Sequence, residues 1–147
     1  MAFAACVVTG LASCTPHPVG PARTYDKYRG KAVTTAESAL SVAQTVQLIA
    51  DAASKDNSFG PYTSVALSDQ EDSINGLQGT FGSIQPPNPP ATRLRNELDA
   101  LLSRAVEGVT DVRIAARQGR LRELGDEAAP LGEVSDALQR FIEANQK

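Results

Sequence analysis

The chain has 147 residues, which gives room for a single domain with a modest hydrophobic core. Its shares of hydrophobic residues (41%) and charged residues (21%) are those of an ordinary globular protein, which excludes disorder throughout the chain. A net charge of -3 and a pI near 5.1 argue against a nucleic-acid binder, because affinity for phosphate backbones comes largely from clustered lysine and arginine.

The first stretch of the chain, MAFAACVVTGLA, has no charge and consists mostly of small or apolar residues. It is too short to cross a bilayer as a helix, which takes about 20 residues, but it fits the apolar part of an export signal. It leads into Leu11, Ala12, Ser13 and Cys14. These four residues resemble the lipobox of bacterial lipoproteins, in which a branched apolar residue and two small residues precede a cysteine.

The resemblance implies that Cys14 receives a diacylglycerol and that cleavage between Ser13 and Cys14 removes residues 1–13 as a signal peptide. Cys6 would leave with that peptide, so the exported chain would keep one cysteine and form no internal disulfide. Two acyl chains, at about 0.8 kcal/mol per buried CH2, anchor a protein stably. The expected location is the outer face of the bacterial cell membrane.

One feature departs from this pattern, because an export signal normally opens with lysine or arginine and the first basic residue here is Arg23. We therefore expect the true start to lie upstream of Met1. The alternative hypothesis is an apolar N-terminal helix in a cytosolic protein with two incidental cysteines.

Residues 14–23 are predicted to form a tether between the lipid and a domain that spans 24–147. Three prolines and a glycine lie within this stretch, which makes it extended rather than helical. His17, the only histidine of the chain, lies between two of these prolines and is interpreted as part of the linker.

A first helix is predicted from Thr24, as its cap, to about residue 56. Small residues recur along it at alternating spacings of four and three, which is a heptad pattern that lets a second helix approach closely. This seam consists of Ala32, Ala36, Ala39, Ala43, Val46, Ala50 and Ala53. Val46 lies near its centre and is predicted to be buried. An aromatic share of only 5%, without tryptophan, also favours closely packed helices over a sheet.

Two further helices are predicted over 62–84 and from Pro89 to the Arg117-Gln118-Gly119 stop. Gly76, Gly79 and Gly82 lie inside the second helix, where they are tolerable if a neighbouring backbone approaches them. Asn88 caps the third helix, and Gly119 can take the left-handed conformation that ends it. The apolar face of the third helix is predicted to consist of Leu94, Leu98, Leu101, Ala105, Val109, Val112 and Ala116.

The last stretch, from Leu121 onward, is predicted to be one helix with a kink at Pro130, because Leu124, Leu131 and Leu138 keep a common phase. The alternative is a break between residues 125 and 130. Four amphipathic helices with short connections predict an all-α, up-down-up-down four-helix bundle. The body resembles small helical-bundle lipoproteins of unknown function, most visibly in residues 115–119 and 129–131.

The residue types argue against catalysis, and no metal or cofactor is expected. The only histidine lies in the tether and Cys14 would be acylated, so neither a histidine-based zinc site nor a Ser-His-Asp arrangement can be assembled. The acidic run Asp69, Glu71 and Asp72 is interpreted as a solvated helix start, which complements the helix dipole.

Two clusters remain as candidate binding surfaces. The first is either a set of helix C-terminal cations or a docking patch for an acidic partner or anionic polymer, and it consists of Arg113, Arg117, Arg120 and Arg122. The second converges at one end of the bundle, either plugging the core or lining a small apolar pocket, and it consists of Tyr25, Tyr28, Phe81 and Phe141.

We expect a non-enzymatic domain that binds another envelope protein. The rival hypothesis is a carrier or sensor of a small apolar ligand at the bundle end, and an enzyme is the third. An exposed apolar patch on a helix face would favour a partner, whereas a closed cavity of at least about 300 Å³ would favour a carrier. Basic residues concentrated at the starts of the first and third helices predict that this end faces the membrane.

Overall fold

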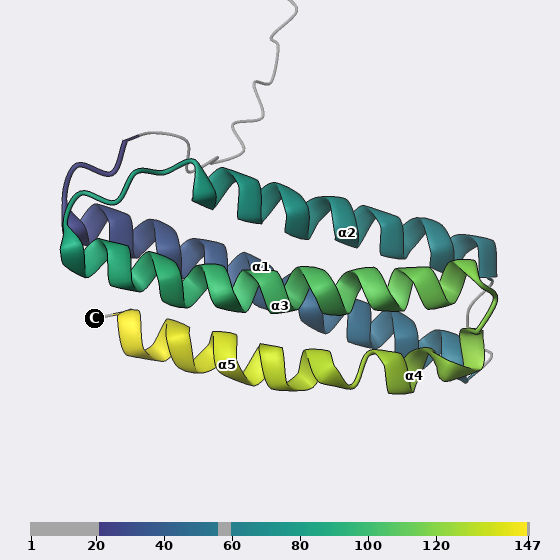
Figure 1. Ribbon diagram of the computed structural model, residues 1–147. Coiled ribbons are helices and arrows are strands. Elements are labelled where there is room, and N and C mark those ends of the chain that lie inside the picture. The colour runs from purple at the N-terminus through teal and green to yellow at the C-terminus, as the bar shows by residue number, and fades with distance from the viewer. Residues whose placement is uncertain (1–20, 56–59, 147) are drawn as a thin grey trace, which may run out of the picture.

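The computed structural model describes residues 21–55 and 60–146, which form helices and turns without a strand (Figure 1). The elements are α1 (Tyr25–Ser54), α2 (Gly60–Gly82), α3 (Pro89–Arg117), a short 3-10 helix η1 (Leu121–Glu123), α4 (Leu124–Glu127) and α5 (Pro130–Asn145). The predicted signal, the lipobox with Cys14, and most of the tether with His17 lie outside the described residues. No described helix is long and apolar enough to cross a membrane.

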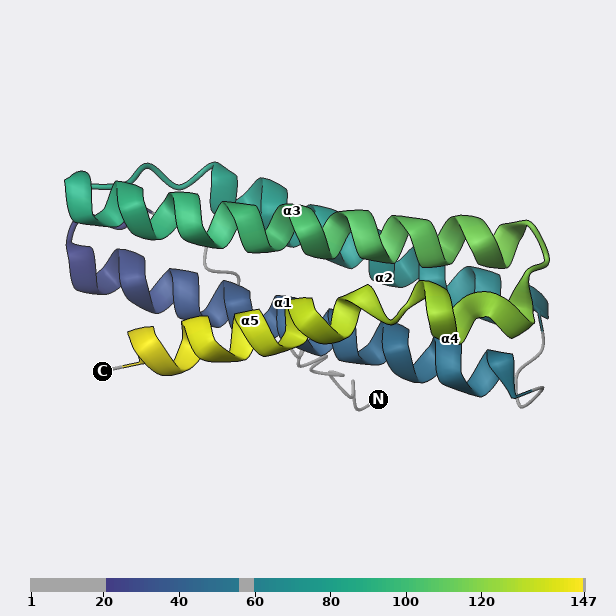
Figure 2. The ribbon, with the colours of Figure 1, turned by 60° about the horizontal axis from the view of Figure 1, so that its bottom comes forward.

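The four long helices alternate in direction, so the predicted all-α, up-down-up-down bundle is confirmed. α1 and α3 contact each other at the centre, and both also contact α2 and α5. α2 and α5 lie on opposite sides of this central pair, as Figures 1 and 2 show. η1 and α4 form the connection that returns the chain from α3 to α5.

The helix ends follow from local signals in the sequence. The Thr24 hydroxyl accepts a hydrogen bond from the Lys27 N–H at the start of α1, and the Asn88 side chain accepts one from the Ala91 N–H at the start of α3. Pro89 opens α3, and Gly119 adopts a φ of +78° just after its end. These predicted caps and stops are confirmed.

The seam of small residues on α1 is buried along its whole length. Its six alanines and Val46 are each at most 1% exposed. They lie in one continuous core with leucines and other apolar residues of α2, α3 and α5. On α3 the buried residue is Leu102 rather than the predicted Leu101, which is only partly buried at the core edge. The predicted core face of α1 is therefore confirmed, and that of α3 changes at one position.

The predicted single helix after Leu121 is wrong, because the chain breaks before Pro130 as in the alternative hypothesis (Figure 2). Proline has no N–H, so Pro130 cannot donate to the Asp126 carbonyl four residues earlier. The Ala129 N–H donates to that carbonyl instead, at 3.2 Å, which is a tight turn. Pro130 then occupies the first position of α5, where the missing donor costs nothing.

The close approach of helices at glycine occurs at a residue that the sequence analysis did not single out. Gly76, Gly79 and Gly82 of α2 have open space around them, so the expectation that a backbone packs against them is wrong. A Cβ at Gly108 of α3 would instead lie 2.7 Å from Leu131 Cδ2 of α5. The missing side chain of Gly108 therefore admits a buried leucine between α3 and α5.

Candidate functional site

Of the four aromatic residues predicted to converge at one end of the bundle, three are buried in the core and Tyr25 packs against it. Tyr28 and Phe81 are completely buried, and their rings are 5.6 Å apart at an angle of 51°. Phe141 is buried as well, whereas Tyr25 is half-buried at the edge, where its ring lies 5.8 Å from the Arg29 guanidinium. None of the four lines the groove formed by residues 21–23 and 83–87 or either of two smaller grooves among the described residues. This arrangement matches a plug of the core better than a ligand pocket.

The Tyr28 hydroxyl is buried and has no hydrogen-bond partner within residues 21–55 and 60–146. Burial raises the pKa of this tyrosine above its ordinary value of 10.0; the nearby Arg95 guanidinium opposes that effect and Asp99 adds to it. Arg95 itself donates to the Gly82 carbonyl at 2.7 Å and pairs with Asp99 at 3.3 Å, so it links the end of α2 to α3. The Tyr28 hydroxyl therefore lies near the polar contacts of Arg95 but takes no part in them.

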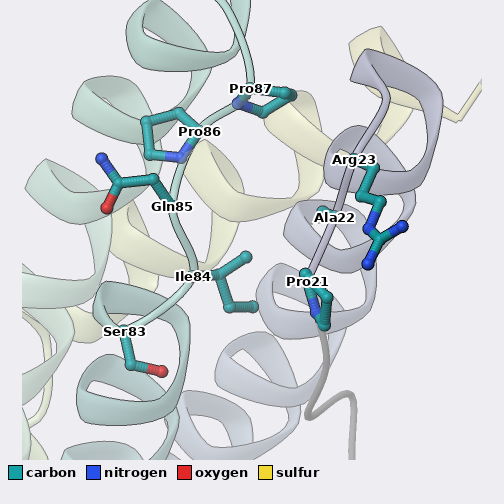
Figure 3. A pocket seen from close by; sticks show the side chains of 8 residues that line it. All are labelled: Pro21, Ala22, Arg23, Ser83, Ile84, Gln85, Pro86 and Pro87. Carbon is teal, nitrogen blue, oxygen red and sulfur yellow. The ribbon is translucent and has the colours of Figure 1, made fainter.

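A groove of about 450 Å³ lies between two extended segments, Pro21–Arg23 and Ser83–Pro87 (Figure 3). These segments run side by side into α1 and α3, and the Ile84 side chain points into the space between them. Ala22 and Ile84 are both buried, and Arg23 is the single charged residue of the lining. The packed domain therefore begins before residue 24, where the tether was expected to end. The volume of this groove exceeds the 300 Å³ or so expected of a carrier's cavity, but the groove is open rather than closed.

The predicted arginine cluster is partly neutralised by its surroundings. Arg113 Nε lies 2.6 Å from Glu71 Oε2, although its N–H is not aligned for a hydrogen bond. Both side chains are only 18% exposed, and the Thr110 hydroxyl donates to the other Glu71 oxygen. Glu71 is therefore the half-buried partner of two α3 residues and not part of a solvated helix start, which corrects that interpretation.

The remaining arginines of the cluster differ from one another. Arg120 pairs with Glu127 and Glu123, whose hydrogen bonds raise the pKa of the guanidinium. These pairs tie η1 to α4 and leave little charge for an external anion. Within this cluster, Arg117 is the exposed arginine whose guanidinium has no partner among the described residues.

Large apolar side chains are exposed in the half of the bundle where α1 and α3 end and α2 begins. Among the described residues they are Leu48, Tyr62, Val65 and Ile114, which are 70%, 70%, 62% and 39% exposed. Tyr62 and Val65 are one turn apart on α2, as Ile114 and Arg117 are on α3, and such pairs are neighbours on a helix surface. The two pairs lie on different helices in the same half of the bundle, and we refer to Tyr62, Val65, Ile114 and Arg117 together as the distal patch.

The distal patch was not predicted, because its residues do not share the periodicity of the core residues. Leu67, Ile74 and Phe81 define that periodicity on α2, and all three are buried. Tyr62 and Val65 fall outside it, so they could have been recognised as apolar residues on the wrong side of the helix.

No group of three or more potential metal-ligating side chains occurs within residues 21–55 and 60–146. Comparisons of the chain with protein-family models, with curated proteins and with solved structures found no match. A function must therefore be inferred from the residues and their geometry.

Replacing Tyr28 by phenylalanine tests the interpretation of the aromatic cluster as a core plug. Because the hydroxyl is buried without a partner, Tyr28→Phe should leave the free energy of unfolding at pH 7 unchanged or raise it by about 1 kcal/mol. Phe81→Ala, in contrast, should lower it by about 3–5 kcal/mol. Urea denaturation followed by circular dichroism measures both.

The same variant has a pH signature. With its pKa raised in the folded state, Tyr28 contributes stability that is present below its ordinary pKa of 10.0 and is lost as the pH rises through the folded value. Tyr28→Phe should abolish that part of the alkaline loss. A large destabilisation of Tyr28→Phe at pH 7 would show that the hydroxyl has a partner and would contradict this account.

Proposed function

We propose that this chain is a bacterial envelope lipoprotein, anchored to the outer face of the cell membrane through Cys14, whose helical domain binds a protein partner and catalyses no reaction. The anchor is supported by the apolar start of the chain and by the Leu11-Ala12-Ser13-Cys14 sequence. The observation that carries the binding role is the distal patch.

The distal patch has the composition of a binding surface. Tyrosine and arginine are enriched among the residues that contribute most of the binding free energy at protein interfaces. Burial of exposed apolar side chains by a partner also favours binding. Tyr62 and Val65 are each more than 60% exposed and lie outside the buried face of the same helix. Arg117 adds a cation beside Ile114. The partner surface that fits is apolar with a carboxylate opposite Arg117.

Tyr62 and Val65 of the distal patch lie far from the first residue that the structure describes. The described chain begins at Pro21, beside the end of α2, whereas Tyr62 and Val65 lie at the start of α2. Val65 is 17 residues from Gly82 at the end of this helix, which is about 25 Å at 1.5 Å per residue, and Tyr62 is farther away. A partner could therefore reach the patch without contact with the membrane.

The groove between Pro21–Arg23 and Ser83–Pro87 favours a second candidate function, the carriage of a small apolar ligand. Its volume of about 450 Å³ lies within the usual range of ligand sites, and its lining is mainly apolar with one arginine. An apolar molecule with an acidic group would fit this chemistry. Because the groove is open, such a ligand would remain partly exposed.

The anchor is tested by metabolic labelling with a fatty acid in a bacterium that expresses the gene behind its own upstream sequence. Cys14→Ala should abolish the label and leave an unprocessed precursor, because no thiol is then available for diacylglycerol. Cys6→Ala is the matched control and should keep both the label and the processing. Label retained by Cys14→Ala would exclude this anchor.

Partner binding is tested by affinity capture from detergent-solubilised envelope, with the captured proteins identified by mass spectrometry. The double variant Tyr62→Ser, Val65→Ser should lose a protein that the unmodified chain captures, with affinity at least about 30-fold lower if the pair costs 2 kcal/mol or more. Both residues are exposed, so the thermal midpoint should stay unchanged.

The matched control is Asp72→Ser with Asn75→Ser, which changes two exposed residues at the same spacing on the same helix. This control should capture the partner as the unmodified chain does. Identical capture by the distal-patch variant and by the unmodified chain would contradict binding through this patch.

A further inference from the structure

One end of the bundle carries a net positive charge although the whole chain has a net charge of -3. We call the described residues 21–31, 88–99 and 137–146 the basic end; they comprise the start of α1, the start of α3 and the last turns of α5. Seven basic and four acidic side chains lie in these three ranges. The rest of the molecule is correspondingly acidic.

Some basic side chains of the basic end form ion pairs with nearby carboxylates, and others are exposed without such a partner. Arg29 pairs with Asp26, and Arg95 pairs with Asp99, each at 3.3 Å. The exposed basic side chains that form no ion pair with a described residue are Arg23, Lys27, Arg93 and Arg140. They come from the segment before α1 and from three different helices, so several elements contribute to the charge of this end.

The stability of the helices does not explain two of these positions. Lys27 and Arg93 lie in the first two turns of α1 and α3. The helix dipole is positive there, so it disfavours a cation, most strongly in the first turn, where Lys27 lies. An external surface of negative charge would reverse that cost, because it attracts both the cations and the positive helix ends.

The position of the chain start indicates which anionic surface lies near. Pro21 follows Cys14 by seven residues, a span of at most about 25 Å when fully extended. If Cys14 carries the lipid, as proposed above, the basic end is tethered within that distance of the headgroups. Each basic residue close to an anionic bilayer contributes to binding, and the effect fades over about 8–10 Å at physiological salt.

We propose that the basic end is a docking surface for the anionic lipid headgroups of the membrane that holds the anchor. Arg23, Lys27, Arg93 and Arg140 contact the headgroups, and the distal patch then faces away from the bilayer. The tethering step rests on the proposed function, whereas the attraction of this end to an anionic bilayer is a property of the folded domain itself.

The experiment measures binding of the full chain with Cys14→Ala, which lacks the lipid, to vesicles by sedimentation at low salt. Vesicles of phosphatidylcholine with phosphatidylglycerol are compared with vesicles of phosphatidylcholine alone. The apolar first residues contribute equally to both, so the difference reports on charge. We expect tighter binding to the anionic vesicles, and equal binding to both would overturn the proposal.

Two variants with the same change in net charge locate the surface. Arg93→Gln with Arg140→Gln should weaken binding to anionic vesicles about 30-fold, since each basic residue is worth roughly five-fold. Lys55→Gln with Arg104→Gln, at exposed positions elsewhere on the bundle, should change it by less than about two-fold. Equal losses from the two pairs would show that only net charge matters and would overturn the proposal.

Two further measurements distinguish docking on a lipid surface from a phosphate-binding site and from binding of the protein partner. Inorganic phosphate, compared with chloride at equal ionic strength, should not displace the chain from anionic vesicles; selective displacement would indicate a phosphate site and overturn docking on a lipid surface. Tyr62→Ser with Val65→Ser should leave vesicle binding unchanged. Loss of partner capture and loss of vesicle binding are therefore separate outcomes.

Discussion

The close packing of α1 against its neighbours depends on the small size of its buried face. The distance between two packed helices is set by the side chains at their contact, at about 8–10 Å. With alanine at most positions of the seam, α1 can contact α2, α3 and α5 together, and it approaches α3 directly across the bundle. α2 and α5 are then held on opposite sides of this central pair. Larger residues from the other helices supply the apolar volume that α1 lacks.

This arrangement makes the two ends of the molecule different from each other. α1 and α3 both begin at one end, so the two extended segments that lead into them run together and form the groove of Figure 3. The basic residues near the same helix starts are gathered there as well. At the other end, α2 begins and α3 ends, so the four residues of the distal patch lie in the same half of the bundle. The end that we propose to face the membrane and the end that we propose to bind a partner are thus set apart by one topology.

The features that were predicted from the sequence depend on residues that lie close together in the chain. A cap such as Thr24 or Asn88 needs only the next few residues, and a seven-residue period needs only one helix, so the starts of α1 and α3 and the α1 seam followed from the residues alone. The features it missed depend on contacts distant in the chain. The Glu71 ion pair with Arg113, the packing of Leu131 on Gly108 and the burial of Ala22 all join separate elements. The lipobox is local too, but it lies outside the described residues and stays a prediction.

The central claim, that the small residues of α1 set the packing of the bundle, is tested most directly by the free energy of unfolding of Ala39→Leu with Ala43→Leu. Both alanines are fully buried, so the added methylenes should overpack the core and lower that energy by about 2–6 kcal/mol in total. Ala100→Leu with Ala144→Leu, at exposed positions, should change it by less than about 1 kcal/mol. If the seam variant were as stable as this control, or more stable, α1 would not be closely packed and the account would be contradicted.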